Sequence, residues 1–210
     1  MKFLPITSNG ERVYAGFWLR FWAGIADAFI LMPPIALLVC LEGFDRTLAI
    51  VITIPASILF AMYNVFFNAR FGGTPGKLAV GIRITKPDGS RIGWTEAWKR
   101  SSVDIIFAVI MLIVGVWALS QVDPIQYASL QHIERTGLVQ GHWPAWYGSV
   151  EILEHVWVWS EVIVLLFNKR KRAIHDFIAG TVVVMEEFTE SHQSISERLD
   201  EILEQSAERP

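Results

Sequence analysis

Four apolar runs, separated by polar segments, dominate the chain. They cover residues 17–41, 48–67, 103–121 and 152–167. A membrane-spanning helix needs about 20 consecutive and mostly apolar residues, a length that the first three runs reach and the fourth approaches. The pattern therefore predicts an all-α membrane protein whose core is a four-helix transmembrane bundle.

The polar segment between the second and third runs has structure of its own. Residues 79–85 alternate as a strand does, and residues 86–89 are typical of a tight turn with a return after it. Residues 181–185 form a second short β-like stretch. We predict that the two strands pair, because each is too short to be stable alone and both flank an apolar run on the same side. Residues 70–100, together with 172–185, are thus expected to form a small β-hairpin-like cytoplasmic module.

The distribution of positive charge predicts the orientation of the bundle. Cytoplasmic loops of membrane proteins carry an excess of Lys and Arg. If the N-terminus is inside and all four runs cross, only Arg46 and Arg135 among the 18 Lys and Arg residues lie outside. A three-span arrangement would instead export either the basic loop 70–100 or the basic block 169–172. The charges therefore indicate that both termini and the module are cytoplasmic.

The composition of the chain restricts the kinds of partner that it is expected to bind. Hydrophobic residues make up 52% of the chain, and the net charge is only −3, with Lys and Arg clustered beside apolar runs. This distribution indicates a lipid bilayer rather than nucleic acid as the partner. Cys40 is the single cysteine, so an intramolecular disulfide is excluded. Residues 1–185 are expected to form one transmembrane domain. The acidic cytoplasmic tail that follows, 186–210, contains an amphipathic stripe, interpreted either as a solvated helix or as a contact with a second copy or a partner protein.

Charged residues inside the apolar runs are the main candidates for function. Arg20 and Asp27 are seven residues apart, so a helix places them on nearly one face. Because a charge at the bilayer centre costs about 2.5–3.5 kcal/mol, we expect both to face protein. Their expected polar partners are Asn64, Asp104 or His175. Asp27 has two interpretations, an intramembrane site for a proton or cation, and a hydrogen-bond acceptor that holds the bundle together.

The remaining polar residues predict neither an enzyme nor a cofactor. Glu151 and His155, four residues apart, supply only two of the ligands that a metal site needs. The turn 72–77 is spaced too tightly for a phosphate-binding loop. The sequence contains no recognisable nucleophile–base arrangement, and we interpret His175 as structural, paired with a nearby carboxylate or carbonyl group. We therefore expect no catalysis and no bound metal.

Three motifs occur together, in one order along the chain. The first is the stretch 14–30, which contains Arg20 and Asp27. The second is Gly73-Thr74-Pro75-Gly76-Lys77 with the strand-like Gly81-Ile82-Arg83-Ile84 after it. The third is Arg172-Ala173-Ile174-His175-Asp176 followed by Gly180-Thr181. In this combination the chain resembles the RDD family of bacterial integral membrane proteins.

The resemblance implies roles for particular residues. Arg20 and Asp27 look like the family's eponymous Arg and first Asp, and either Asp104 or Asp176 is similar to the second. Structural roles are implied for the motif residues Gly73, Thr74, Gly76, Lys77, Arg172, His175, Asp176, Gly180 and Thr181. The implied location is the bacterial cytoplasmic (inner) membrane. A transport role is commonly supposed for the family, and some members are linked to sodium–proton exchange.

Two functional hypotheses follow. The first is a small transporter, or transporter subunit, for a cation or proton, because ionisable residues inside a membrane often mark ion paths. Its intramembrane polar residues would be Arg20, Asp27, Asn64, Asp104 and Glu161. The second is a non-catalytic membrane scaffold or accessory protein that acts through its module and tail.

Overall fold

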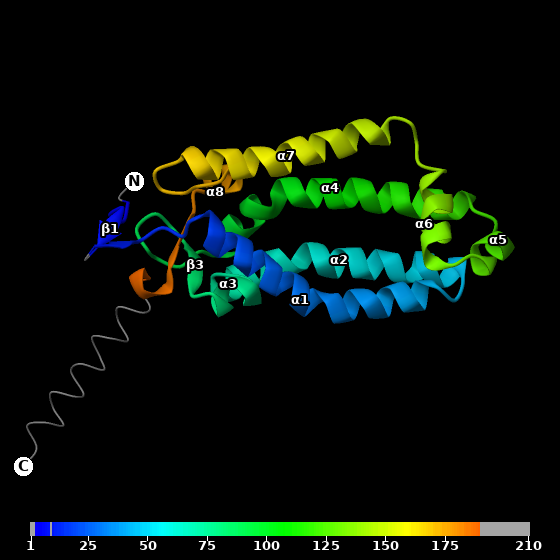
Figure 1. Ribbon diagram of the computed structural model, residues 1–210, viewed down its shortest axis with the longest axis horizontal. Helices are drawn as coiled ribbons and strands as arrows, with labels where there is room; N and C mark the ends of the chain where they lie inside the picture. The colour runs from blue at the N-terminus through cyan, green and yellow to red at the C-terminus, as the bar shows by residue number, and fades with distance from the viewer. Residues whose placement is uncertain (1–2, 9, 190–210) are drawn as a thin grey trace, which may run out of the picture.

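Four long helices run side by side in the computed structural model, which describes residues 3–8 and 10–189 (Figure 1). They are α1 (Phe17–Glu42), α2 (Arg46–Phe71), α4 (Trp94–Gln121) and α7 (Tyr147–Phe167). Asp45 begins α2, since its side chain accepts the N–H groups of the next turn at 2.7 and 3.0 Å. The helix ends at Gly72, whose φ of 77° is the left-handed conformation that glycine adopts without strain.

Among the described residues, three helices are long and apolar enough to cross a membrane, namely α1, α2 and α4. Large apolar side chains on them point outward and are exposed, among them Phe29, Leu59 and Ile113. The fourth long helix, α7, is not in this set, because three glutamates are spread along it. Three of the four predicted spans are therefore candidate membrane-spanning helices by length and composition, and a count of four spans is not confirmed.

The far end of the bundle is closed by two short helices that the sequence did not predict. They are α5 (Pro124–Ser129) and α6 (His132–Gln140), within the segment 121–150. The side chain of Tyr127 is buried against Ala49, Leu119 and Val122, and its hydroxyl donates to the carbonyl oxygen of Glu42 at 3.2 Å. This contact holds the loop to the ends of α1, α2 and α4.

The opposite end carries the predicted module. Its elements are α3 (Pro75–Ala79), β3 (Ile82–Thr85), α8 (Ile174–Ala179), β4 (Val182–Met185) and the 3-10 turn η1 (Glu186–Phe188). Strands β3 and β4 pair antiparallel, with Ile82 opposite Met185, so the predicted pairing is confirmed. The predicted return after the turn is reduced to one bridge between Thr85 and Arg91. The buried and β-branched strand β4 pairs with β3 along its whole length, so the small β module that was expected is present.

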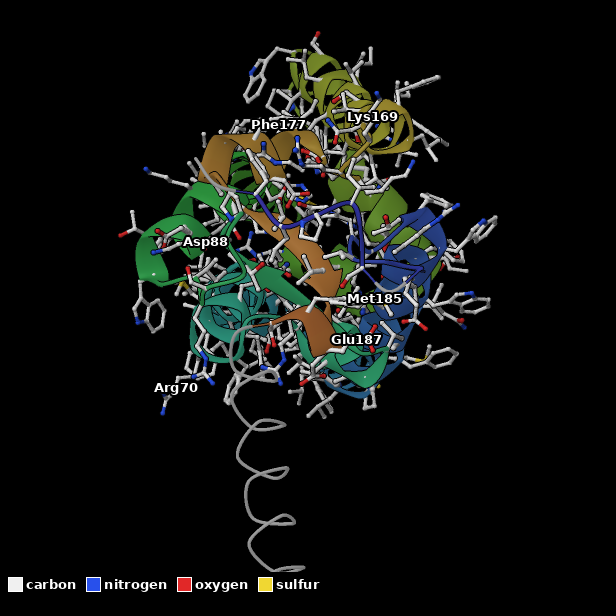
Figure 2. The ribbon with its side chains drawn as sticks, turned by 90° about the vertical axis from the view of Figure 1, so that its left-hand side faces the viewer. Arg70, Asp88, Lys169, Phe177, Met185 and Glu187 are labelled. Carbon is white, nitrogen blue, oxygen red and sulfur yellow. The ribbon has the colours of Figure 1, made fainter. Side chains whose placement is uncertain are left out.

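The N-terminal segment joins this sheet from its other side. The N–H of Ala15 donates to the carbonyl oxygen of Val183 at 3.0 Å, and Met185 donates to Val13 at 2.9 Å. Ahead of it, β1 (Thr7–Ser8) and β2 (Glu11–Arg12) form a separate small hairpin. Figure 2 looks onto this end, with Arg70, Asp88 and Lys169 on its outer rim. The segments expected to be cytoplasmic thus gather at one end of the bundle.

The module extends slightly past residue 185. Glu186, expected at the start of the tail, forms an ion pair with Arg83 at 2.6 Å, and its N–H donates to the carbonyl oxygen of Gly81 at 2.9 Å. The rest of the predicted tail, including its amphipathic stripe, lies outside the described residues.

Candidate functional site

Asp176 is the centre of a buried charge network at the module end of the bundle. Its side chain is completely buried. Arg20, from α1, donates to Asp176 Oδ2 at 2.9 Å, and Arg100, from α4, donates to Oδ1. The backbone N–H of Ala173 reaches Oδ2 at 2.9 Å, and the hydroxyl of Thr181 lies 3.4 Å from Oδ1. One carboxylate from α8 therefore joins two long helices.

The charge on Asp176 is permanent. Burial alone would raise the pKa of this carboxyl group, but the attraction of Arg100 and then of Arg20 outweighs burial and holds the pKa well below its usual range. A group that stays ionised throughout the physiological range does not exchange protons in a transport cycle. Asp176 is thus a fixed counter-charge.

Arg20 joins three parts of the chain. Besides the ion pair, its Nε donates to the carbonyl oxygen of Ala15 at 3.3 Å and its Nη2 donates to that of Lys171 at 2.5 Å. Lys171 has a φ of 50°, a left-handed conformation that is uncommon outside glycine. The loop after α7 thus turns its carbonyl group toward the arginine, which a planar guanidinium with several donors can bind together with Asp176.

Asp27 lies in a separate cluster of hydrogen bonds. Its carboxylate accepts from the hydroxyl of Tyr63 at 2.8 Å, the hydroxyl of Thr74 at 2.5 Å and the backbone N–H of Gly76 at 2.7 Å. A Cβ atom added at Gly76 would lie 2.7 Å from the Cγ of Asp27, so only glycine allows α3 to approach α1 this closely. Three donors on one carboxylate match the packing interpretation of Asp27.

The expected inward orientation of Arg20 and Asp27 is therefore confirmed, but their expected partners are wrong. Neither side chain bonds Asn64, Asp104 or His175. The reason is that the turn after α2 packs against α1, and that helix α8, which packs on α4, brings Asp176 within reach of Arg20. Their backbone N–H and side-chain groups occupy the positions that we expected polar residues of neighbouring spans to fill.

His175 links Arg100 to Glu161 of α7. Arg100 Nη2 lies 2.6 Å from His175 Nε2, and Nδ1 lies 2.6 Å from Glu161 Oε2. Because a guanidinium only donates, Nε2 must accept, and the ring proton belongs on Nδ1 facing Glu161. Burial and the charge of Arg100 lower the pKa of His175, in keeping with a neutral ring. His175 thus lies beside a carboxylate, as expected, and its structural role stays a prediction.

The remaining motif residues shape the module around this network. Arg172 donates from Nε to the carbonyl oxygen of Thr181 at 3.0 Å and from Nη2 to that of Asp176 at 2.9 Å. Gly180 ends α8 with a φ of 68°. Gly73 lies close to Lys77, since a Cβ added there would be 3.3 Å from the Cβ of the lysine.

The RDD family model matches residues 14–180 of the chain. The protein belongs to the RDD family. The match spans all three motifs up to Gly180, so the fold just described, with its apolar helices, is that of an RDD-family membrane protein. No curated protein and no solved structure matches the chain.

Asn64 and Asp104, two of the sequence-predicted residues, lie outside the network in this RDD protein. Asp104 accepts a hydrogen bond from Trp157 Nε1 at 3.0 Å, which joins α4 to α7. Asn64, Ser101 and Asp104 line two adjoining cavities, of about 410 and 190 Å³, beside α2 and α4. Of the five predicted intramembrane polar residues, Arg20 and Glu161 belong to the charge network and Asp27 belongs to the separate hydrogen-bond cluster. The other two, Asn64 and Asp104, line the cavities.

Arg100 and Tyr63 are the residues that the sequence did not reveal. Arg100 stands in a basic segment next to a span, where such charges are ordinary, and its partner is 76 residues away. Tyr63 resembles any aromatic residue near the end of a span. One feature of the sequence could have indicated Arg100. It is one helical turn from Asp104, so the two residues lie on the same face of α4.

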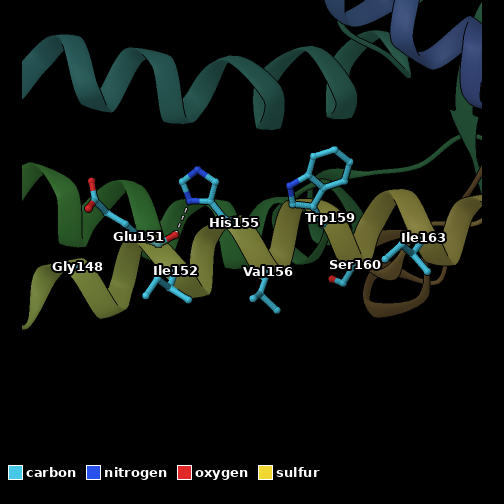
Figure 3. A pocket seen from close by; sticks show the side chains of 8 residues that line it. All are labelled: Gly148, Glu151, Ile152, His155, Val156, Trp159, Ser160 and Ile163. Carbon is cyan, nitrogen blue, oxygen red and sulfur yellow. Dashed lines mark hydrogen bonds between the residues drawn. The ribbon is translucent and has the colours of Figure 1, made fainter.

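The Glu151–His155 pair lies on the surface of α7. His155 Nδ1 bonds the backbone carbonyl oxygen of Glu151 at 2.7 Å, and all the residues around this shallow hollow come from α7 alone (Figure 3). In the part of the chain that the structure describes, no three His, Cys, Asp or Glu side chains gather as a metal site requires.

Proposed function

We propose that this RDD protein is a small transporter, or a transporter subunit, that moves protons across the bacterial cytoplasmic membrane. The observation that carries the proposal is the pair of adjoining cavities that share Asn64, Ser101 and Asp104. The larger cavity extends from Asp104 along Ser57 and Thr53 to Trp143, near the far end of the bundle. The smaller one extends from Asp104 to the module. Polar side chains therefore follow one another through otherwise apolar helices.

Asp104 is the proposed proton-carrying group. It is the carboxylate that lines both cavities, whereas Asp27 and Asp176 are each bound by several donors. The buried Nε1 of Trp143 has no hydrogen-bond partner among the described residues, which favours water in the larger cavity. A proton fits this path better than a metal cation, because the smaller cavity is lined by Arg20, Lys77 and Arg100.

We further propose that α7 is a fourth span and that both termini are cytoplasmic. With 21 residues, α7 is about 31 Å long, close to the thickness of the hydrocarbon core. Of its glutamates, Glu161 lies against His175 at the module end, where its carboxylate accepts the backbone N–H of His175 at 2.8 Å rather than facing lipid. The gathering of the basic segments at the module end, together with the excess of positive charge in cytoplasmic loops, supports this orientation.

A flux measurement tests the transport proposal. The purified protein, reconstituted into sealed liposomes with a pH-sensitive dye inside, should dissipate an imposed proton gradient faster than empty liposomes do. Asp104→Asn should reduce the rate at least tenfold, because asparagine keeps the bond from Trp157 but does not carry a proton. Asp88→Asn, in an exposed turn, is the matched control and should leave the rate unchanged. Equal rates with wild-type protein and with empty liposomes would refute the proposal.

The alternative, a scaffold or accessory protein, is favoured by one observation. The carboxylates of Asp27 and Asp176 each accept several hydrogen bonds, most of them from other elements, as in a rigid structural contact. An absence of flux from correctly folded wild-type protein would support this function.

A further inference from the structure

The smaller cavity has a lining suited to an anion. It lies beside the charge network, has a volume of about 190 Å³, and is bordered by residues of α1, α2, α3, α4 and α8. Arg20, Lys77 and Arg100 line it from three different elements, and Asp104 is the one carboxylate in the lining. The carboxylates that balance the arginines, Asp176 above all, are not part of the lining. The cavity therefore faces more positive than negative charge.

Lys77 is the cation that most needs a counter-charge there. In the described part of the chain, no carboxylate lies within ion-pair distance of its ammonium group. Its ammonium group donates a hydrogen bond to the hydroxyl of Thr74, at 3.3 Å. A partly buried ammonium group beside two guanidinium groups is unfavourable unless an anion joins them.

One neutral residue of the lining, Asn68, also has a polar atom without a partner in the part of the chain that the structure describes. Asn68 is only 2% exposed, and its Oδ1 has no hydrogen-bond partner among the described residues. An amide oxygen that is buried in this way costs about 1–3 kcal/mol unless a donor reaches it. Asn64 and Ser101 add further polar groups to the same wall. A ligand that fits must accept hydrogen bonds from the cations and also donate at least one.

We propose that this cavity binds a small oxyanion of the phosphate type, with hydrogenphosphate as the form that fits. The three cations belong to different elements, α1, α3 and α4, and phosphate has an oxygen for each of them, whereas a carboxylate has only two. The remaining P–OH group supplies the donor that Asn68 Oδ1 lacks. The volume equals roughly six water molecules, enough for this ion but not for a nucleotide or a lipid with its chains. The inference does not depend on proton transport.

Binding should weaken at alkaline pH. Burial, and then the charge of Arg100, lower the pKa of Lys77 to about 8. Below that pH the ammonium group is charged and attracts the anion, and above it the amine is neutral and does not. The other charged groups around the lysine are Arg20, Arg100, Asp27 and Asp176, and Asp104 and His175 line the same cavity. Phosphate affinity should therefore fall between pH 7.5 and pH 9.5.

The test is calorimetric titration of the full-length protein in a neutral detergent without phospholipid. Sodium phosphate should give saturable binding at pH 7.5, and sodium chloride at equal ionic strength should give none. Sodium sulfate, which has the shape but not the hydroxyl group, should bind at least fivefold more weakly. Lys77→Gln should weaken phosphate binding at least tenfold, whereas Lys99→Gln, an exposed lysine on α4, should not change it.

A second variant keeps the proposal testable if Lys77→Gln fails to fold. Asn68→Asp has nearly the same shape and places a negative charge in the cavity wall, so it should abolish phosphate binding. Three results would overturn the proposal: no saturable binding of phosphate to the wild type, equal affinities of Lys77→Gln and Lys99→Gln, or a response to added phosphatidylglycerol without one to free phosphate. Equal affinities for sulfate and phosphate would overturn the choice of hydrogenphosphate.

Discussion

The ion pairs of Asp176 predict a large loss of stability when its charge is removed. In Asp176→Asn, Arg20 and Arg100 stay buried, with side chains 13% and 7% exposed, but lose their common counter-charge. The amide group has nearly the shape of the carboxylate, so the packing is kept. Its NH₂ group, however, would face donors, because Arg20 and the N–H of Ala173 both donate to Oδ2.

The expected loss is about 3–5 kcal/mol in the free energy of unfolding, the range for removing one partner of a buried ion pair. The pKa of Asp176 is lowered, so its stabilising effect is complete above the unfolded pKa of about 3.9 and is lost only as the pH falls toward the folded value. The difference between variant and wild type should therefore be constant between pH 6 and pH 8.

Reversible unfolding in mixed micelles, followed by tryptophan fluorescence, measures this difference. Asp88→Asn is the matched control, because Asp88 is exposed and bonds only Ser90 of its own turn, and it should stay within about 0.5 kcal/mol of wild type. A loss below about 1 kcal/mol in Asp176→Asn would show that the two arginines do not depend on this carboxylate.

Two further predictions concern packing and orientation. Gly76→Ala should lower the unfolding free energy by at least about 2 kcal/mol, since its Cβ would overlap the backbone of α1. The control Gly24→Ala, which has open space around it, should be neutral or slightly stabilising in the same unfolding measurement. Equal effects of the two substitutions would show that α3 shifts freely on α1. In a Cys40→Ser background, a cysteine at Ser129 should react with an impermeant maleimide added to intact cells and one at Ser90 should not, and the reverse labelling pattern would contradict the proposed orientation.

Residue spacing predicted those features that depend on local pattern. The apolar runs indicated α1, α2 and α4, although α4 begins at Trp94, ahead of the third run, which was predicted to start at residue 103. The pairing of β3 with β4 was predictable because two short strands flanked spans on the same side. The inward orientation of Arg20 and Asp27 followed from their shared helix face and the cost of charge in lipid.

Features that depend on the docking of distant segments were not predictable. The sequence does not reveal that Arg100 meets Asp176, since neither residue differs from an ordinary interfacial charge before α8 is placed. The third donor to Asp27 is the backbone N–H of Gly76, a group that every residue except proline carries. The glycine itself was part of a recognised motif, but the reason for it is a contact across the bundle.

The order of the network along the chain has a consequence for biosynthesis. Arg20 and Arg100 leave the ribosome well before Asp176, the carboxylate that both contact. Because early segments of a protein begin to assemble while later ones are still being made, α1 and α4 must enter the membrane with these two arginines unneutralised by their final partner. The helices therefore reach their final arrangement only after translation has passed α8. A message cut short before that point would yield inserted helices that lack the residue that joins them.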